Sequence, residues 1–118
     1  MNRELAEKQG RRAETLAAWW LTFRGWRVVA KRMRTPYSEV DLLALRGRVL
    51  ALVEVKRRAT WEACEDALDW STRRRLDRAC EWVEAHNRLA KKREVRVDAV
   101  YVVGWRVRHV PEPWRYGD

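Results

Sequence analysis

Hydrophobic residues recur along the chain with two patterns of spacing, one of which predicts helices and the other strands. Over residues 4–24 apolar residues return every three or four positions, which predicts a helix that ends at Gly25. Apolar and β-branched runs at 26–30, 40–45 and 49–53 predict three short strands. The third run is apolar at every position, which is typical of a strand covered on both faces, so we expect it at the centre of the sheet.

The second half of the chain predicts another helical region followed by strands. Helical spacing returns over 65–89, which predicts one helix or a broken pair, with Ser71 or Thr72 as the N-cap of the longer segment. Residues 95–103 have the β-branched content of a strand, and a short strand is expected at 107–110. This order of elements predicts an α/β sandwich with a mixed central sheet.

The chain is expected to form a single domain over residues 1–118. The chain is long enough for one core, no repeat or flexible linker divides it, and residues 111–118 should form an irregular tail. No run approaches the roughly 18 apolar residues of a membrane span, and no secretory signal is evident, so we expect a cytoplasmic protein. Cys64 and Cys80 have no companions at metal-ligand spacing and are expected to be ordinary core or helix residues.

The charge of the chain indicates a partner that carries phosphates. The formal net charge is +9, and Lys and Arg neutralise phosphates with release of counterions. Most of this charge is arginine, which binds phosphate oxygens in pairs, although a GC-rich genome also enriches arginine. An acidic protein partner is a weaker alternative. The eight Trp residues could stack on bases, but we expect them in the core, where such residues more often lie in a small domain.

Acidic residues and one lysine recur at strand spacing on either side of a predicted turn. Glu39 and Asp41 share one face of their strand, and Glu54 and Lys56 share one face of the next. A two-residue loop at Arg46–Gly47 would bring all four side chains to the same face, whereas three loop residues would separate the pairs.

The two-residue loop also predicts a register for the hairpin. It sets Asp41 opposite Leu52 and Glu39 opposite Glu54. Acids so placed repel one another and need compensation. A hard divalent cation such as Mg²⁺ or Mn²⁺ would supply it, and such ions also accept phosphate oxygens, which suits phosphodiester chemistry. The alternative is that Glu54 and Lys56 form a solvated ion pair.

Glu14 is the remaining candidate acid. It falls in the apolar stripe of the first helix, in line with Ala17 and Leu21, where a carboxylate needs a partner. Gly10, one turn earlier, would allow a backbone or a substrate to approach closely. Glu14 therefore either joins the acids of the sheet as a fourth member or bonds to an Arg or Lys at the edge of the stripe.

The motifs of the chain resemble those of a known family. Gly10-x3-Glu14-x2-Ala17, Glu39-Val40-Asp41-Leu42-Leu43, Val53-Glu54-Val55-Lys56-Arg57-Arg58 and Arg96-Val97-Asp98 are similar to the YraN-like family of small bacterial proteins. That family is a branch of the PD-(D/E)xK, or restriction-endonuclease-like, superfamily, which includes the archaeal Holliday junction resolvases. The resemblance therefore implies a restriction-endonuclease-like α/β/α sandwich and a magnesium-dependent endonuclease.

The resemblance also implies roles for individual residues. Asp41, Glu54 and the main chain of Val55 would bind Mg²⁺ or Mn²⁺, Lys56 would assist the nucleophilic water, and Glu14 would complete the acidic cluster. The substrate would be DNA, branched or damaged in repair or recombination, and a homodimer would cut both strands. A nucleic-acid-binding module that keeps the fold without catalysis is the alternative.

The chain departs from the family pattern at three places. Ser38 stands where the family usually has Gly, Arg32 stands where it usually has Asn, and a lysine at the start of the second large helix is absent. Neighbouring arginines are the candidates for its phosphate contacts, although they could instead form a solvated helix face. The residues expected to bind nucleic acid are Arg34, Arg57, Arg58, Arg73, Arg74, Arg75 and Arg78.

Overall fold

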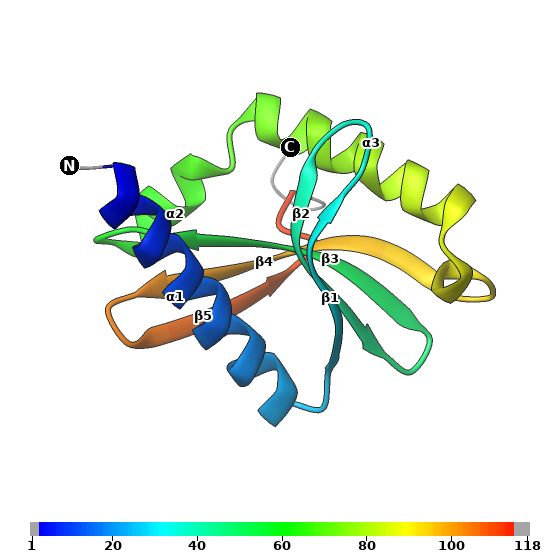
Figure 1. The fold of residues 1–118 in the computed structure, drawn as a ribbon, viewed down its shortest axis with the longest axis horizontal. Helices are drawn as coiled ribbons and strands as arrows, with labels where there is room; N and C mark the ends of the chain where they lie inside the picture. Colours follow the sequence, from blue (N-terminus) through cyan, green and yellow to red (C-terminus); the bar gives the residue numbers. More distant parts are fainter. Residues whose placement is uncertain (1–2, 115–118) are drawn as a thin grey trace.

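The chain forms a mixed five-stranded sheet covered by three α-helices (Figure 1). The fold is described from a computed structural model over residues 3–114, with side chains from residue 8 onward. The strands lie in the order β1-β2-β3-β4-β5, and β3 and β4 are parallel whereas the other neighbours are antiparallel. The elements are α1 (Arg3–Phe23), β1 (Arg27–Arg34), β2 (Glu39–Arg46), β3 (Val49–Arg57), α2 (Trp61–Ala67), α3 (Trp70–His86), the 3₁₀ turn η1 (Arg88–Ala90), β4 (Glu94–Val103) and β5 (Arg106–Pro111).

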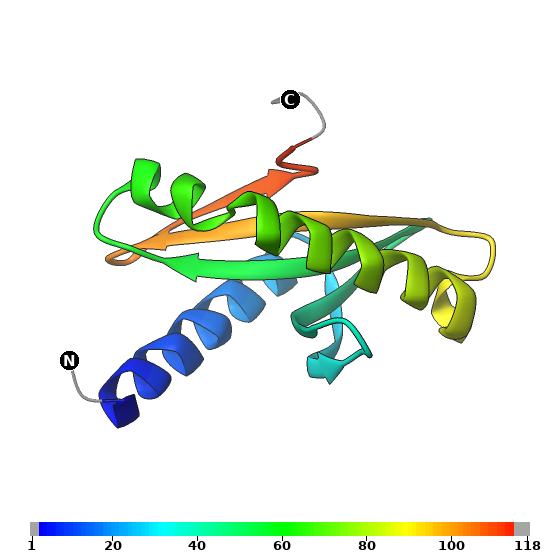
Figure 2. The same ribbon diagram turned by 90° about the horizontal axis from the view of Figure 1, so that it is seen from above.

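The central strand β3 is buried on both faces, as its uninterrupted apolar run predicted. Ala51 and Val53 pack in the cluster that contains α1, whereas Leu50 and Leu52 pack in the cluster that contains α3. The helices therefore form a layer on each side of the sheet (Figure 1). Toward its N-terminus α1 diverges from the sheet (Figure 2).

Of the two predicted alternatives, one helix or a broken pair, the structure has the broken pair, and the predicted N-cap is wrong. The structure breaks the helical region into α2 and α3 at Leu68 and Asp69. Asp69 caps α3, since its side chain accepts a hydrogen bond from the Thr72 N–H at 2.8 Å. Ser71 and Thr72 instead lie within the first turn. An aspartate placed before the helix satisfies its free N–H groups and has a favourable interaction with the helix dipole.

The hairpin of β2 and β3 has the expected two-residue turn, although it lies one residue later than predicted. Arg46 pairs with Val49, so the turn is Gly47–Arg48, and Gly47 adopts a φ of +58° that suits glycine. Leu52 consequently pairs with Leu43 rather than with Asp41. The register moves by an even number of residues, so the faces on which the side chains lie are unchanged.

The tryptophans meet the prediction of core positions only in part, whereas the cysteines meet theirs. Trp26 is buried, but the expectation of a core position is wrong for Trp19, Trp70 and Trp105, which are 64%, 66% and 89% exposed. The expectation for the cysteines is confirmed, because Cys64 is buried in α2 and Cys80 is half-buried in α3.

Strand β5 extends to Pro111, one residue into the predicted tail. Trp114 then donates a hydrogen bond from Nε1 to Asp77 at 3.2 Å, so the start of this segment packs on α3. The rest of the predicted tail, residues 115–118, lies outside the described residues. Among the helices that the structure describes, none combines the length and apolar character that crossing a membrane requires.

Candidate functional site

A hollow of about 570 Å³ lies between the N-terminal half of α1, the open end of the β2–β3 hairpin and the segment that leads into α2. It contains all four of the predicted catalytic side chains. The lining residues are Gln9, Gly10, Ala13, Glu14, Asp41, Glu54, Val55, Lys56, Arg57, Arg58 and Ala59.

Asp41 and Glu54 meet where the hairpin opens. Regular pairing of β2 with β3 stops at Leu42 and Val53, and one further step along this register sets Asp41 across from Glu54. There the Val55 N–H donates its hydrogen bond to Asp41 Oδ2, at 2.8 Å, rather than to a backbone carbonyl of a neighbouring strand. Glu54 is only 7% exposed. The end of the sheet therefore holds two acidic side chains in a largely enclosed place.

The electrostatics of this pair favour a bound proton or cation. The pKa of Asp41 is raised to about 8, chiefly by burial and also by the charge of Glu54 and a hydrogen bond with it. The Val55 N–H and the Lys56 ammonium act in the opposite direction. Near neutral pH the pair therefore retains a proton, and a divalent cation could replace this proton.

Lys56 supplies the nearest positive charge to the acids. Its Nζ lies 3.3 Å from Glu54 Oε2, and its side chain is 21% exposed. The predicted ion pair thus exists, but it is half-buried and lies beside a second acid rather than on a solvated face. One ammonium group faces two carboxylates, so it balances their charge only while the pair retains its proton.

The donor set fits a hard divalent cation. The carboxylates of Asp41 and Glu54 and the main chain of Val55 offer oxygen ligands at one end of the hollow, and Mg²⁺ accepts few protein ligands because it keeps several waters. Among the side chains described from residue 8 to residue 114, no group of three His, Cys, Asp or Glu is assembled for a metal ion. The protein would thus contribute two carboxylates, with water or phosphate completing the coordination.

Glu14 lines the hollow and is also held by a residue that the sequence analysis did not include in the site. Arg32 Nε bonds Glu14 Oε1 at 3.0 Å, and this bond is the main cause that raises the pKa of Arg32. Both sequence interpretations of Glu14 therefore hold in part. Arg32 lies on β1 with a φ of +52°, a left-handed conformation that is uncommon for residues other than glycine and asparagine. The only sequence signal was the arginine found in place of the usual asparagine.

Glu39 and Gly10 were also expected near the acids. Glu39 is exposed and does not line the hollow, although it was expected on the same face as Asp41. The pairing of β1 with β2 is continuous past Arg32, because Lys31 pairs with Leu42 and Met33 with Val40, and the register shift of β1 lies between Val28 and Ala30. Gly10 lines the hollow, but a Cβ built there would meet nothing within 4 Å, so no other part of the described chain requires this glycine.

The seven predicted nucleic-acid-binding arginines fall into separate groups. Arg57 and Arg58 line the acidic hollow, and Arg34 is exposed at the end of β1. Arg73 departs from the predicted cluster on α3, because its guanidinium lies 5.3 Å from the Trp114 ring centroid in another hollow. A further hollow holds the other three arginines and is lined by Tyr37, Trp70, Ser71, Arg74, Arg75 and Arg78.

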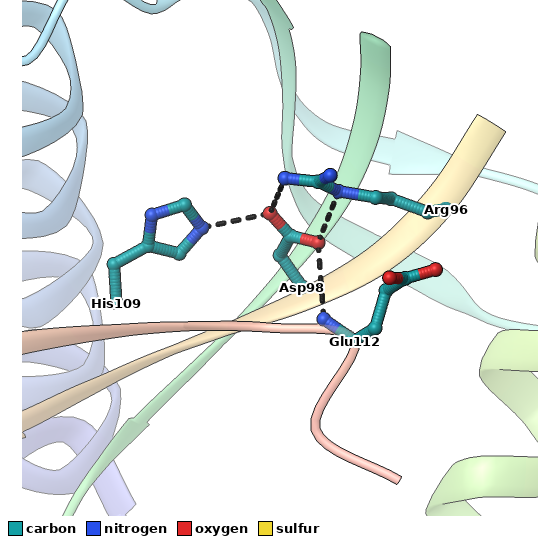
Figure 3. A network of polar contacts seen from close by, with 4 residues as sticks. All are labelled: Arg96, Asp98, His109 and Glu112. Atoms are coloured by element: carbon teal, nitrogen blue, oxygen red, sulfur yellow. Dashed lines mark hydrogen bonds and ion pairs between the residues drawn. The ribbon is translucent and has the colours of Figure 1, made fainter. Parts of the chain in front are cut away.

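A second buried carboxylate lies beneath α1, and its surroundings differ from those of Asp41 (Figure 3). Asp98 is fully buried and accepts hydrogen bonds from Arg96 at 2.9 and 3.2 Å. His109 Nε2 lies 2.7 Å from the same carboxylate, and the Glu112 N–H donates to it at 3.4 Å. The Arg96-Val97-Asp98 motif thus contributes to an enclosed polar network rather than to the acidic hollow.

Comparisons with known proteins identify the family. Residues 13–102 match a family described as "Uncharacterised protein family UPF0102". The chain belongs to the UPF0102 family. A UPF0102 protein of Caulobacter vibrioides is 46% identical over 110 residues, which cover 92% of this chain and 88% of the relative. A UPF0102 protein of Sphingopyxis alaskensis is 41% identical over 117 residues, which cover 98% of this chain and 99% of the relative. The UPF0102 match includes Glu14, Asp41, Glu54 and Lys56.

Proposed function

We propose that the protein is a divalent-cation-dependent endonuclease of the PD-(D/E)xK type that hydrolyses phosphodiester bonds in DNA. The observation that carries the proposal is the enclosed pair of Asp41 and Glu54 beside Lys56 at the end of the central strands. A catalytic acid pair explains why carboxylates of like charge are placed together within a basic protein. The order of a helix, three antiparallel strands, helices and a parallel strand supports a restriction-endonuclease-like sandwich.

The cation would be held by Asp41, Glu54 and the main chain of Val55. When bound, Mg²⁺ or Mn²⁺ supplies a Lewis acid that polarises a phosphate oxygen and makes water a stronger nucleophile. The raised pKa of Asp41 means that binding would displace a proton from the pair.

The basic residues of the hollow have complementary tasks. The Lys56 ammonium is oriented by Glu54 and can donate a hydrogen bond to the attacking water or to a non-bridging phosphate oxygen. Arg57 ends β3, Arg58 follows it, and both line the same hollow, where they can bind the flanking phosphates. The substrate backbone would therefore be held over the acids while Lys56 stabilises the developing negative charge.

A non-catalytic nucleic-acid-binding module is the second candidate function. It is favoured by the ion pair that holds Glu14 on Arg32, because Glu14 is then not free to act as a further acid. In that case the protein would bind DNA without cleaving it in any divalent ion.

A cleavage assay separates the two functions. Labelled single-stranded, duplex, flap and four-way substrates are incubated with Mg²⁺, Mn²⁺ or EDTA. We expect cation-dependent cleavage that falls by at least about 100-fold in Asp41→Asn, Glu54→Gln and Lys56→Ala. Glu39→Gln is the matched control, since Glu39 is an exposed acid outside the hollow, and it should cleave like the wild type. Binding with no cleavage of any substrate would establish the second candidate, and cleavage by a variant lacking both acids would reveal a contaminant.

A further inference from the structure

Two exposed aromatic side chains and three arginines surround a hollow of about 300 Å³ that the acid site does not use. Tyr37 comes from the turn between β1 and β2, and Trp70 begins α3. In Figure 1 this turn rises toward the first half of α3. The arginines Arg74, Arg75 and Arg78 continue along α3 on the same hollow.

The aromatic rings are exposed to an extent that packing within the chain does not explain. Trp70 is 66% exposed and Tyr37 is 46% exposed. The Arg74 guanidinium lies 4.7 Å from the centroid of the Trp70 ring, so it covers one part of the indole and leaves most of the side chain accessible. Large aromatic surfaces in water are unfavourable, and beside arginines they form a platform for nucleobases.

The hollow is linked to the acid site along the chain and through Asp69. Tyr37 lies shortly before β2, the strand that carries Asp41. The pKa of Asp69, which caps α3, is lowered mainly by its hydrogen bond with Thr72 and also by the charges of Arg75 and Lys56. A strand held by both Lys56 and the α3 arginines would thus pass Asp69 at the start of α3.

We propose that the Tyr37–Trp70 hollow binds unpaired nucleobases, so that the substrate of the acid site contains a single-stranded segment. The inference rests on the proposed function and specifies its substrate class. Bases stacked and paired within an intact duplex cannot present their faces to Trp70, whereas those of a flap, fork or open junction can. The three arginines would bind the phosphates on either side of the stacked base.

Binding of labelled oligonucleotides in EDTA tests the hollow separately from catalysis. A single strand and a blunt duplex of the same sequence, each as DNA and as RNA, are titrated with the full chain and its variants. We expect Trp70→Ala to weaken single-strand binding by about tenfold and duplex binding by less than about twofold. Tyr37→Ala should act in the same direction, and Trp70→Phe should restore most of the affinity because it retains a stacking face.

Trp105→Ala is the matched control, since Trp105 is 89% exposed but lies outside this hollow. It should bind both substrates like the wild type. Comparison of the DNA and RNA oligonucleotides shows which nucleic acid the hollow binds. Equal losses on single strand and duplex for Trp70→Ala, no loss in either aromatic variant, or the same loss in Trp105→Ala would overturn the inference. If one of these results is found but cleavage still depends on Asp41, only the inference about the Tyr37–Trp70 hollow fails. If Trp70→Ala selectively weakens single-strand binding but the protein cleaves no substrate, only the proposed nuclease activity fails.

Discussion

Two aspartates of one sheet, the buried Asp98 and the half-buried Asp41, are placed in opposite chemical surroundings. Asp98 is fully buried and is met by Arg96, His109 and the Glu112 N–H (Figure 3). Asp41 lies beside Glu54 and receives one backbone N–H, from Val55. The first carboxylate is provided with partners on every side, whereas the second lies against another acid.

Asp98 is suited to a structural role, whereas Asp41 is suited to the role proposed for it at the acid site. A buried carboxylate with complete partners contributes to the fold and offers nothing to a ligand. An acid pair with an unbalanced charge is costly to the fold and is retained where a cation or proton compensates it. Removing Asp98 should therefore lower the free energy of unfolding. Removing Asp41 should reduce cleavage and raise the free energy of unfolding.

The largest expected effect on stability is that of Asp98→Ala. The change leaves Arg96 and His109 beside a cavity without their carboxylate, so the free energy of unfolding should fall by about 3–5 kcal/mol. Urea unfolding at pH 7 measures it. An exposed acid such as Glu39→Ala should change this free energy by less than about 0.5 kcal/mol. A loss below about 1 kcal/mol for Asp98→Ala would show that the network is not structural.

Bound cation should stabilise the wild type next most strongly. A cation that binds only the folded state adds about 2.7 kcal/mol when its concentration is about 100 times Kd. Thermal unfolding with increasing Mg²⁺ or Mn²⁺ measures the shift, which should disappear in Asp41→Asn and Glu54→Gln and persist in Glu39→Gln. Equal shifts in all four proteins would place cation binding elsewhere.

The pH dependence of stability should distinguish Asp41 from an ordinary surface acid. Its pKa is about 8 in the folded protein and about 3.9 when unfolded, so the folded state binds the proton more tightly. This group's contribution to stability is full below about pH 4, falls as pH rises, and levels off above about pH 8. In EDTA, Asp41→Asn should therefore gain at least about 1 kcal/mol relative to the wild type between pH 5 and pH 9. A constant difference across that range would contradict the raised pKa.

The smallest expected effect concerns the left-handed backbone at Arg32. Arg32→Asn and Arg32→Ala both remove the ion pair with Glu14, but only asparagine tolerates a φ of +52° well. The asparagine variant should be more stable than the alanine variant by about 0.5–1 kcal/mol in urea unfolding. Equal stabilities would mean that the backbone relaxes at no cost.

Much of the fold follows from periodicity in the sequence. The order of elements and the central position of β3 were predicted, because the spacing of apolar residues follows from which faces of an element are buried. Whether the second helical region is broken was left open. The N-cap of α3 was missed because Ser71, Thr72 and Asp69 are all good caps, and only the path of the preceding turn selects among them.

The site was predictable to the level of which side chains meet, but not how they are arranged. The even length of the hairpin turn was enough to gather Asp41, Glu54 and Lys56, even though the register itself was wrong. The role of Arg32 depends on a left-handed residue inside a strand, and the exposure of Trp70 depends on tertiary packing. Neither is encoded in a local pattern, because each is decided by neighbours that are distant in sequence.

The hydrogen bond from Val55 to Asp41 makes one backbone amide a built-in sensor of the acid pair. In a regular ladder the Val55 N–H would report only on the strand, but here it points at a side-chain oxygen. Its nuclear magnetic resonance frequency should therefore follow the ionisation of Asp41 and the arrival of a cation. A single labelled valine signal, followed during a titration, would thus read the charge state of the site without any substrate present.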